Sequence, residues 1–343
     1  MNTKNYLFLK SWLLTIISLI FVIILVGGLT RLTGSGLSMV DWNLIMGMIP
    51  PMTHLDWVHV FEKYQQFPEF QQLNFTITLS EFKTIFLWEY IHRMLGRVIG
   101  LVIIFGFIYM CINFKTYKRF LFNGFLMSIL VISQGLLGWY MVQSGLVDIP
   151  RVSHFRLASH LFLALLLLQF IIWTFLSIDR KKIKFSRLSF FSIVWTFLLG
   201  IQILYGAFMA GLKAGWGYNT YPLMGNKFLP EAAFIFKSFT QNIFYNPVMI
   251  QFIHRHFPII LFILFLILGI KILRSYKNKI VHFFVISTFL VFVIQFILGV
   301  LTLVWVVPIF AASIHQLMAV ILLTSSICLN YFLLYNSNSS MKN

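Results

Sequence analysis

The stretch Trp88–Gly100, WEYIHRMLGRVIG, joins the start of an apolar helix to an unusual group of ionisable side chains. From Leu95 onward the sequence is typical of a membrane-spanning helix. Four ionisable residues lie at the entrance of this helix: Glu89, His92, Arg93 and Arg97. Charge at membrane depth costs several kcal/mol unless it is shielded, so such residues are rare and usually functional. The stretch therefore predicts a membrane helix that carries a site near one end.

The composition around this stretch is that of an integral membrane protein. Of the 343 residues, 59% are hydrophobic and 10% are charged, and the mean hydropathy is +0.88. A membrane helix needs about 20 apolar residues, and the segments lack the polar–apolar alternation of a β-barrel. The sequence thus predicts an all-α integral membrane protein with eight transmembrane helices, at residues 12–30, 90–112, 120–142, 155–177, 189–210, 252–273, 282–304 and 309–334.

The net charge of +17 indicates membrane topology rather than nucleic-acid binding. Cytoplasmic loops collect Lys and Arg, and the segments expected on one side of the membrane contain a single acidic residue, Asp179. We therefore expect both termini to be cytoplasmic and the loops at about 31–87 and 211–251 to face outward. Fifteen of the 26 basic residues lie in the segments expected to be cytoplasmic: Lys4, Lys10, Lys115, Lys118, Arg119, Arg180, Lys181, Lys182, Lys184, Arg187, Lys271, Arg274, Lys277, Lys279 and Lys342.

Two cysteines, Cys111 and Cys328, lie in or at the ends of apolar segments and suggest neither a disulfide framework nor a zinc site. The first apolar segment has no small-residue cleavage pattern, so we interpret it as a retained helix. No Arg- and Ser-rich presequence precedes it, which favours a bacterial inner membrane.

Similar residues recur in the two halves of the chain. The first helix ends near Gly27-Gly28, and the fifth ends near Gly206-Ala207. The second helix starts near His92-Arg93, and the sixth starts near His254-Arg255. Gln134 with Gly138 in the third helix corresponds to Gln295 with Gly299 in the seventh, and His160 in the fourth corresponds to His315 in the eighth. Four matches in one order predict two repeated four-helix bundles, residues 1–180 and 181–343, related by an axis along the membrane normal.

Four histidines occupy corresponding places in this repeat. His92, His160, His254 and His315 are each expected within the first turns of a helix that runs inward, so all four would lie near the outer leaflet. Imidazole is a common ligand of haem iron, and helix bundles build cofactor sites from facing side chains. The natural pairs are His92 with His160 and His254 with His315. A zinc or copper site is the alternative, but few Cys or carboxylate ligands lie nearby.

Glu89 lies one helical turn before His92, whereas Gln251 occupies the corresponding place before His254. One predicted haem site therefore has a carboxylate that the other lacks, so one site could be reactive and the other an electron carrier. The alternative is an ion pair between Glu89 and Arg93 that only neutralises a helix entrance. Arg93 and Arg255 are suited to haem propionates, although snorkelling to the interface would also explain them.

The chain resembles the haem A synthase family, of the branch found in proteobacteria and mitochondria. The resemblance covers nearly the whole length and is most specific in the segment 81–100, EFKTIFLWEYIHRMLGRVIG, where EYIHR stands in its full context. It extends to 27–43 (GGLTRLTGSGLSMVDWN), 47–52 (GMIPPM), 61–70 (FEKYQQFPEF), 134–146 (QGLLGWYMVQSGL), 156–167 (RLASHLFLALLL), 252–256 (FIHRH) and 314–319 (IHQLMA). The cysteine pair that some relatives carry in the outer loop is absent here.

This resemblance implies conversion of haem O to haem A by two successive hydroxylations of the methyl group on carbon 8 to a formyl group. His92 and His160, with Arg93, would bind the substrate haem O. His254 and His315, with Arg255, would hold a resident haem b, and Glu89 would be the catalytic acid. The expected protein partners are a haem O synthase and an unidentified electron-transfer protein. Membrane lipid would surround the chain.

Three other functions fit parts of the sequence. A di-haem b-type electron-transfer cytochrome would use the same histidines, although cytochromes of that kind usually place haems in both leaflets. A transporter with repeated halves, or a structural assembly factor, needs no paired histidines.

Overall fold

The computed structural model describes residues 6–41, 48–147, 150–178 and 183–335, and within them it has helices, loops and an isolated bridge between Met224 and Lys227 but no strand. The prediction of an all-α protein with eight spans is confirmed. The long apolar helices are α1 (Leu7–Leu32), α4 (Leu79–Ile112), α6 (Leu121–Gln143), α7 (His154–Leu176), α8 (Arg187–Gly211), α10 (Pro247–Ser275), α11 (Lys279–Val304) and α12 (Ile309–Leu334).

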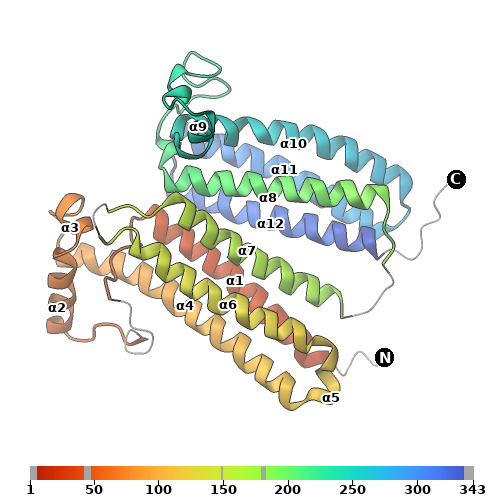
Figure 1. Cartoon of the computed structure of the whole chain (residues 1–343), viewed down its shortest axis with the longest axis horizontal. Coiled ribbons are helices and arrows are strands. Elements are labelled where there is room, and N and C mark those ends of the chain that lie inside the picture. Colours follow the sequence, from red (N-terminus) through yellow and green to blue (C-terminus); the bar gives the residue numbers. More distant parts are fainter. Residues whose placement is uncertain (1–5, 42–47, 148–149, 179–182, 336–343) are drawn as a thin grey trace. The chain divides into compact units, whose positions relative to one another are not determined.

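Short helices connect these spans (Figure 1): α2 (His54–Gln65), α3 (Pro68–Gln72), α5 (Phe114–Tyr117) and α9 (Phe239–Tyr245), with 3-10 turns at Lys118–Phe120, Ala214–Trp216 and Glu231–Phe234. Some residues of the sequence argument lie outside the described part: Lys4, Trp42, Asn43, Gly47, Asp179, Arg180, Lys181, Lys182 and Lys342.

The chain divides into two compact units, residues 2–171 and 172–343, with the boundary inside α7. In the first unit α4 packs against both α1 and α6. In the second unit α8 and α11 each pack against both α10 and α12, and Figure 1 shows these four helices side by side. The assignment of a four-helix bundle to residues 1–180 and of its repeat to 181–343 stays a prediction.

Helix α4 begins earlier than predicted. It starts at Leu79 rather than near residue 90, because Thr78 and Glu81 form a capping box in which each side chain accepts a hydrogen bond from the other's main-chain N–H. The apolar run alone could not locate this start, since the added turns are amphipathic. His92 therefore lies several turns inside the helix and not in its first turns.

The added turns of α4 pack against the loop that contains α2 and α3. Their common centre, which we call the loop core, consists of Met39, Tyr64, Phe82 and Phe86. Helix α2 includes His54 and His59, so both histidines lie in the loop after α1 and not in a span. Because Met39 follows α1 closely, the loop core fixes the chain that leaves α1 against the outer turns of α4.

Candidate functional site

The four predicted histidines lie in two pairs, one pair in each unit. The rings of His254 on α10 and His315 on α12 have centroids 6.3 Å apart and planes at 89°. His92 on α4 and His160 on α7 lie within electrostatic range of each other. A metal–nitrogen bond is about 2 Å long, so the spacing of His254 and His315 leaves room for one metal ion between the two rings. The structure thus brings together both pairs that the sequence predicts.

Each of the four imidazoles packs directly on a glycine of a neighbouring helix, an arrangement that we call a glycine seat. A Cβ atom at the glycine would come closer to the ring than the van der Waals contact at which ordinary side chains pack. The distances from such a Cβ to the ring Cε1 are 2.8 Å for Gly27 and His92, 2.9 Å for Gly138 and His160, 3.1 Å for Gly206 and His254, and 2.9 Å for Gly299 and His315. The missing side chain therefore makes room for the ring in all four cases.

Two of these histidines are also fastened by a glutamine one turn before the glycine. Gln202 Nε2 donates to the main-chain carbonyl of His254 at 2.8 Å and lies 2.9 Å from its Nδ1. Pro258, four residues further along α10, has no N–H, so the helix leaves the His254 carbonyl without its usual donor. Gln134 Nε2 donates to the His160 carbonyl at 3.0 Å and lies 3.4 Å from the ring Nε2.

Glu89 is buried, with 2% of its surface exposed, and three donors converge on its carboxylate. Oε2 accepts from Ser38 Oγ at 2.7 Å and from the Met39 N–H at 2.8 Å, while Oε1 accepts from Arg93 Nη2 at 2.5 Å. Arg93 also donates to the carbonyls of Met39 and Asp41, at 2.8 and 3.1 Å. A buried carboxylate needs such partners. The predicted Glu89–Arg93 ion pair is therefore present, and it ties the loop after α1 to α4.

The second unit ties its corresponding loop with an amide instead of an acid. Gln251 Nε2 donates to the Gly217 carbonyl at 2.7 Å. Arg255 Nη2 donates to the carbonyls of Thr220 and, at 3.1 Å, Leu223. In both units, then, the residue three before the histidine and the arginine after it hold the loop that follows the unit's first helix. The ties differ in their chemistry: the Glu89 carboxylate accepts from Ser38, the Met39 N–H and Arg93, whereas the Gln251 amide donates to a carbonyl.

Arg255 has donors available for an acidic group. It is 7% exposed, and among the described residues its Nε and Nη1 have no hydrogen-bond partner. Buried donors without partners are costly, and a guanidinium edge suits a carboxylate.

The sequence argument did not single out Arg31 and Arg151, which lie within electrostatic range of each other in the first unit. The sequence could have indicated Arg31 as a candidate, because it is a charged residue at the glycine-rich end of an apolar helix.

The other histidines lie outside the pairs. His256 Nδ1 is 2.8 Å from the Phe252 carbonyl, and His282 Nε2 is 2.5 Å from the Tyr276 carbonyl. Within the described ranges, no three residues of the types His, Cys, Asp and Glu meet to form a metal site. An iron porphyrin supplies its own nitrogens and needs only axial ligands from the protein. Pairs of imidazoles against glycines therefore fit a haem better than a bare zinc or copper ion.

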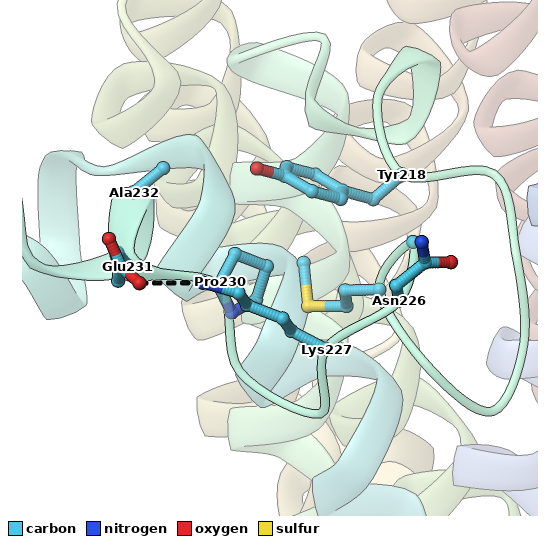
Figure 2. Close-up of a pocket in the computed structure, with 8 residues that line it drawn as sticks. Tyr218, Asn226, Lys227, Pro230, Glu231 and Ala232 are labelled. Atoms are coloured by element: carbon cyan, nitrogen blue, oxygen red, sulfur yellow. Dashed lines mark hydrogen bonds and ion pairs between the residues drawn. The ribbon is translucent and has the colours of Figure 1, made fainter.

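A hollow in the loop between α8 and α10 is separate from the histidines. Its volume is about 370 Å³, and Figure 2 shows residues around it, with the ion pair between Lys227 and Glu231 (2.6 Å) at one side. Its wall consists of Tyr218, Met224, Gly225, Asn226, Lys227, Pro230, Glu231 and Ala232. None of the paired histidines belongs to this wall, so we place the candidate site at the imidazole pairs.

Comparison with known proteins gives consistent matches over nearly the whole chain. Residues 10–327 match a family described as cytochrome oxidase assembly protein. A protein named Heme A synthase from Pelagibacter ubique is 40% identical over 342 residues, which is 99% of each chain. Heme A synthase from Rickettsia bellii is 40% identical over 339 residues, 96% of this chain and 99% of the relative. Heme A synthase from Ehrlichia canis is 38% identical over 321 residues, 91% of this chain and 89% of the relative.

Proposed function

The chain belongs to the cytochrome oxidase assembly protein family, together with relatives named Heme A synthase, and we propose that its N-terminal unit is where haem O is oxidised to haem A. It is a multi-pass membrane protein and an enzyme of haem A biosynthesis. The proposed reaction is an oxidation in two successive hydroxylations of a porphyrin methyl group, after which loss of water leaves a formyl group. Each hydroxylation removes an electron pair, so the enzyme is an oxidoreductase.

One observation supports the choice of the N-terminal unit. Both units pair two imidazoles over glycines, and both tie a loop through the residue three before the first histidine. In the first unit that residue is Glu89, and in the second it is Gln251. The two ties have opposite polarity, since Glu89 accepts from Ser38, the Met39 N–H and Arg93 whereas Gln251 donates to a carbonyl, so only the first unit places a negative charge at this position. A buried acid beside the substrate is what oxidation chemistry can use.

In this proposal His92 and His160 hold the substrate haem O, and Arg93, Arg31 and Arg151 provide positive charge for its propionates. Oxidation of a ring methyl develops positive charge next to the porphyrin. The Glu89 carboxylate stabilises this charge and orients water or accepts a proton. Ser38, the Met39 N–H and Arg93 fix the carboxylate in place, so it need not reorganise as the charge develops.

The C-terminal unit supplies a resident haem b site in the same proposal. His254 and His315 would hold it through their imidazoles, and the two donors of Arg255 that have no partner among the described residues would bind a propionate. A bound haem b transfers single electrons, at a potential set by its ligands and burial. Gln251 in place of an acid and the fastening of His254 by Gln202 suit a group that is retained.

The remaining parts of the proposal concern its surroundings. The bacterial relatives and the eight spans favour the inner membrane of a bacterium. The distribution of Lys and Arg is the ground for proposing that both termini are cytoplasmic. A haem O synthase would supply the substrate, and a separate electron-transfer protein would exchange electrons with haem b. Lipid would surround the spans.

The test is co-expression of the full chain with a haem O synthase, followed by mass spectrometry of the extracted haems. The variant Glu89→Gln keeps one acceptor oxygen for Ser38 and the Met39 N–H and loses the charge that pairs with Arg93, so it should bind both haems but form no haem A. The matched change Gln251→Glu should leave haem A formation in place. Wild-type amounts of haem A from Glu89→Gln would refute the catalytic role of Glu89. Extraction of haem b alone from the wild-type chain would point to an electron-transfer cytochrome instead.

A further inference from the structure

The two imidazoles of the N-terminal unit are held in different ways. Both rest on glycine seats, Gly27 for His92 and Gly138 for His160. His160 is also fastened by Gln134, whose amide donates to its carbonyl at 3.0 Å. The residue one turn before Gly27, where the other helices carry glutamine, is Ile23. Ile23 offers the His92 ring a main-chain carbonyl but no side-chain amide.

The neighbours of His92 on α4 do not replace the missing amide. Glu89 contacts Ser38 and the Met39 N–H, and Arg93 contacts Glu89 and the carbonyls that follow α1. These side chains hold the loop and not the imidazole. Within the part of the chain that the structure describes, the seat and the Ile23 carbonyl hold the His92 ring, and no side-chain hydrogen bond does.

Glutamine occupies the turn before the other three glycine seats. Gln202 donates to His254 at 2.8 Å, and Gln295 lies one turn before Gly299, the seat of His315. Within each unit one histidine is fastened, His160 in the first and His254 in the second. Among the four, His92 alone faces an aliphatic side chain at the fastening position.

We propose that His92 is the releasable iron ligand of the N-terminal unit and that His160 is its fixed ligand, positioned by Gln134. This inference rests on the proposed function, in which that unit binds haem O and gives up haem A. A haem that must enter and leave needs one bond to iron that opens readily. In the second unit Gln202 fastens His254, and a glutamine rather than an aliphatic residue stands at the corresponding place for His315, which suits a haem that is retained. His92 is also the side on which a small external ligand reaches the iron.

The experiment uses the full chain purified after co-expression with a haem O synthase, and carbon monoxide as the probe of an open iron position. After reduction, His92→Ala should keep a haem in the N-terminal unit and bind carbon monoxide at once. His160→Ala should lose that haem. Haem b in the C-terminal unit reports in the same sample that the variant is folded.

Two further variants leave both histidines in place. Ile23→Gln adds the missing amide and should slow carbon monoxide binding roughly fivefold, the effect of one ordinary hydrogen bond. Gln134→Leu removes the existing amide and should weaken retention of the same haem to a similar extent. Val22→Gln is the matched control, since it adds an amide to α1 at a side chain that is 46% exposed, and should change neither quantity.

The inference fails if His160→Ala keeps the N-terminal haem while His92→Ala loses it, or if both lose it equally. It also fails if Ile23→Gln binds carbon monoxide as fast as the wild type. These outcomes are distinct from failure of the proposed function, which would appear as a wild-type chain without haem O or haem A. If the wild-type chain forms haem A but His92→Ala and His160→Ala lose the N-terminal haem equally, this inference alone is contradicted.

Discussion

Four glycines decide where the candidate ligands can sit. At Gly138 a Cβ would lie 2.9 Å from the His160 ring, whereas at Gly135, on the same helix, nothing lies within 4 Å. Alanine at the first position must push the ring away, and overpacking of this kind costs about 1–3 kcal/mol. Gln134 resists the shift, because it holds the carbonyl of the same histidine.

We therefore expect Gly138→Ala to lower the haem content of the N-terminal unit and Gly135→Ala to leave it unchanged. The measurement is the amount of each haem per chain in the purified protein. Both variants add one methyl group to α6, so helix propensity and hydrophobicity are matched. Equal haem contents in the two variants would show that the seat is not needed.

At the residue scale, the sequence allowed the two histidine pairs to be predicted because helical order and repeat position alone determine which imidazoles meet. The contacts of Glu89 with Ser38 and Met39 could not be predicted. They join residues about 50 positions apart through a loop whose path the periodicity of the helices does not specify. Gln202 was also missed, although Pro258 signals a carbonyl without its helical donor four residues earlier.

At the scale of elements, α2 and α3 depend on a buried tyrosine. Tyr64 donates to Glu69 Oε2 at 3.0 Å and accepts from Asn74 Nδ2 at 2.7 Å, and its ring belongs to the loop core. Burial, and next the charge of Glu69, raise the pKa of Tyr64 well above its ordinary value. The neutral phenol is therefore the form that the fold stabilises.

The pH dependence follows from the direction of this shift. An unfolded tyrosine ionises at about pH 10, and the folded one ionises at higher pH. The contribution of Tyr64 is complete below pH 10 and is lost as the pH rises from there toward the folded pKa. We expect an alkaline protease to cleave after Lys63 faster as the pH rises above 10 in the wild type.

The variant Tyr64→Phe separates ionisation from packing. It cannot ionise, so the rise in cleavage above pH 10 should disappear. It also loses two hydrogen bonds, which should destabilise the folded loop by about 1–3 kcal/mol. Cleavage at pH 8 should therefore already be faster than in the wild type. A wild-type rate at pH 8 together with an unchanged alkaline rise would contradict the role given to Tyr64.

Helix boundaries show where pattern reasoning ends at this scale. The spans of α11 and α12 begin and end close to the predicted residues, because their apolar runs coincide with the helices. Helix α4 does not, since its first turns are packed by the loop core and capped by Thr78 and Glu81 rather than buried in lipid. A capping box could have been read from the sequence, whereas the loop core depends on tertiary contacts.

For the whole molecule, eight spans and the location of the basic residues predict one topology, with both termini in the cytoplasm. Lys10 lies at the start of α1, Lys115 and Lys118 follow the end of α4, and Lys271 and Arg274 lie near the end of α10. Because successive spans alternate in direction, these ends are expected on one side of the membrane. The segments at the opposite ends include α2, α3 and α9. Lys and Arg near the ends of membrane helices favour the cytoplasm, and an even number of spans returns the chain to the side where it began.

Reporter fusions test this topology directly. Green fluorescent protein after residue 343 should fluoresce, and alkaline phosphatase at the same place should be inactive, because each reporter matures on one side of the membrane only. Alkaline phosphatase inserted in the α2–α3 loop or near residue 228 should be active. With the C-terminus outside, the histidine pairs would lie toward the cytoplasmic leaflet, and the substrate would have to enter from that side. The same fusions therefore also decide from which leaflet haem O reaches His92 and His160.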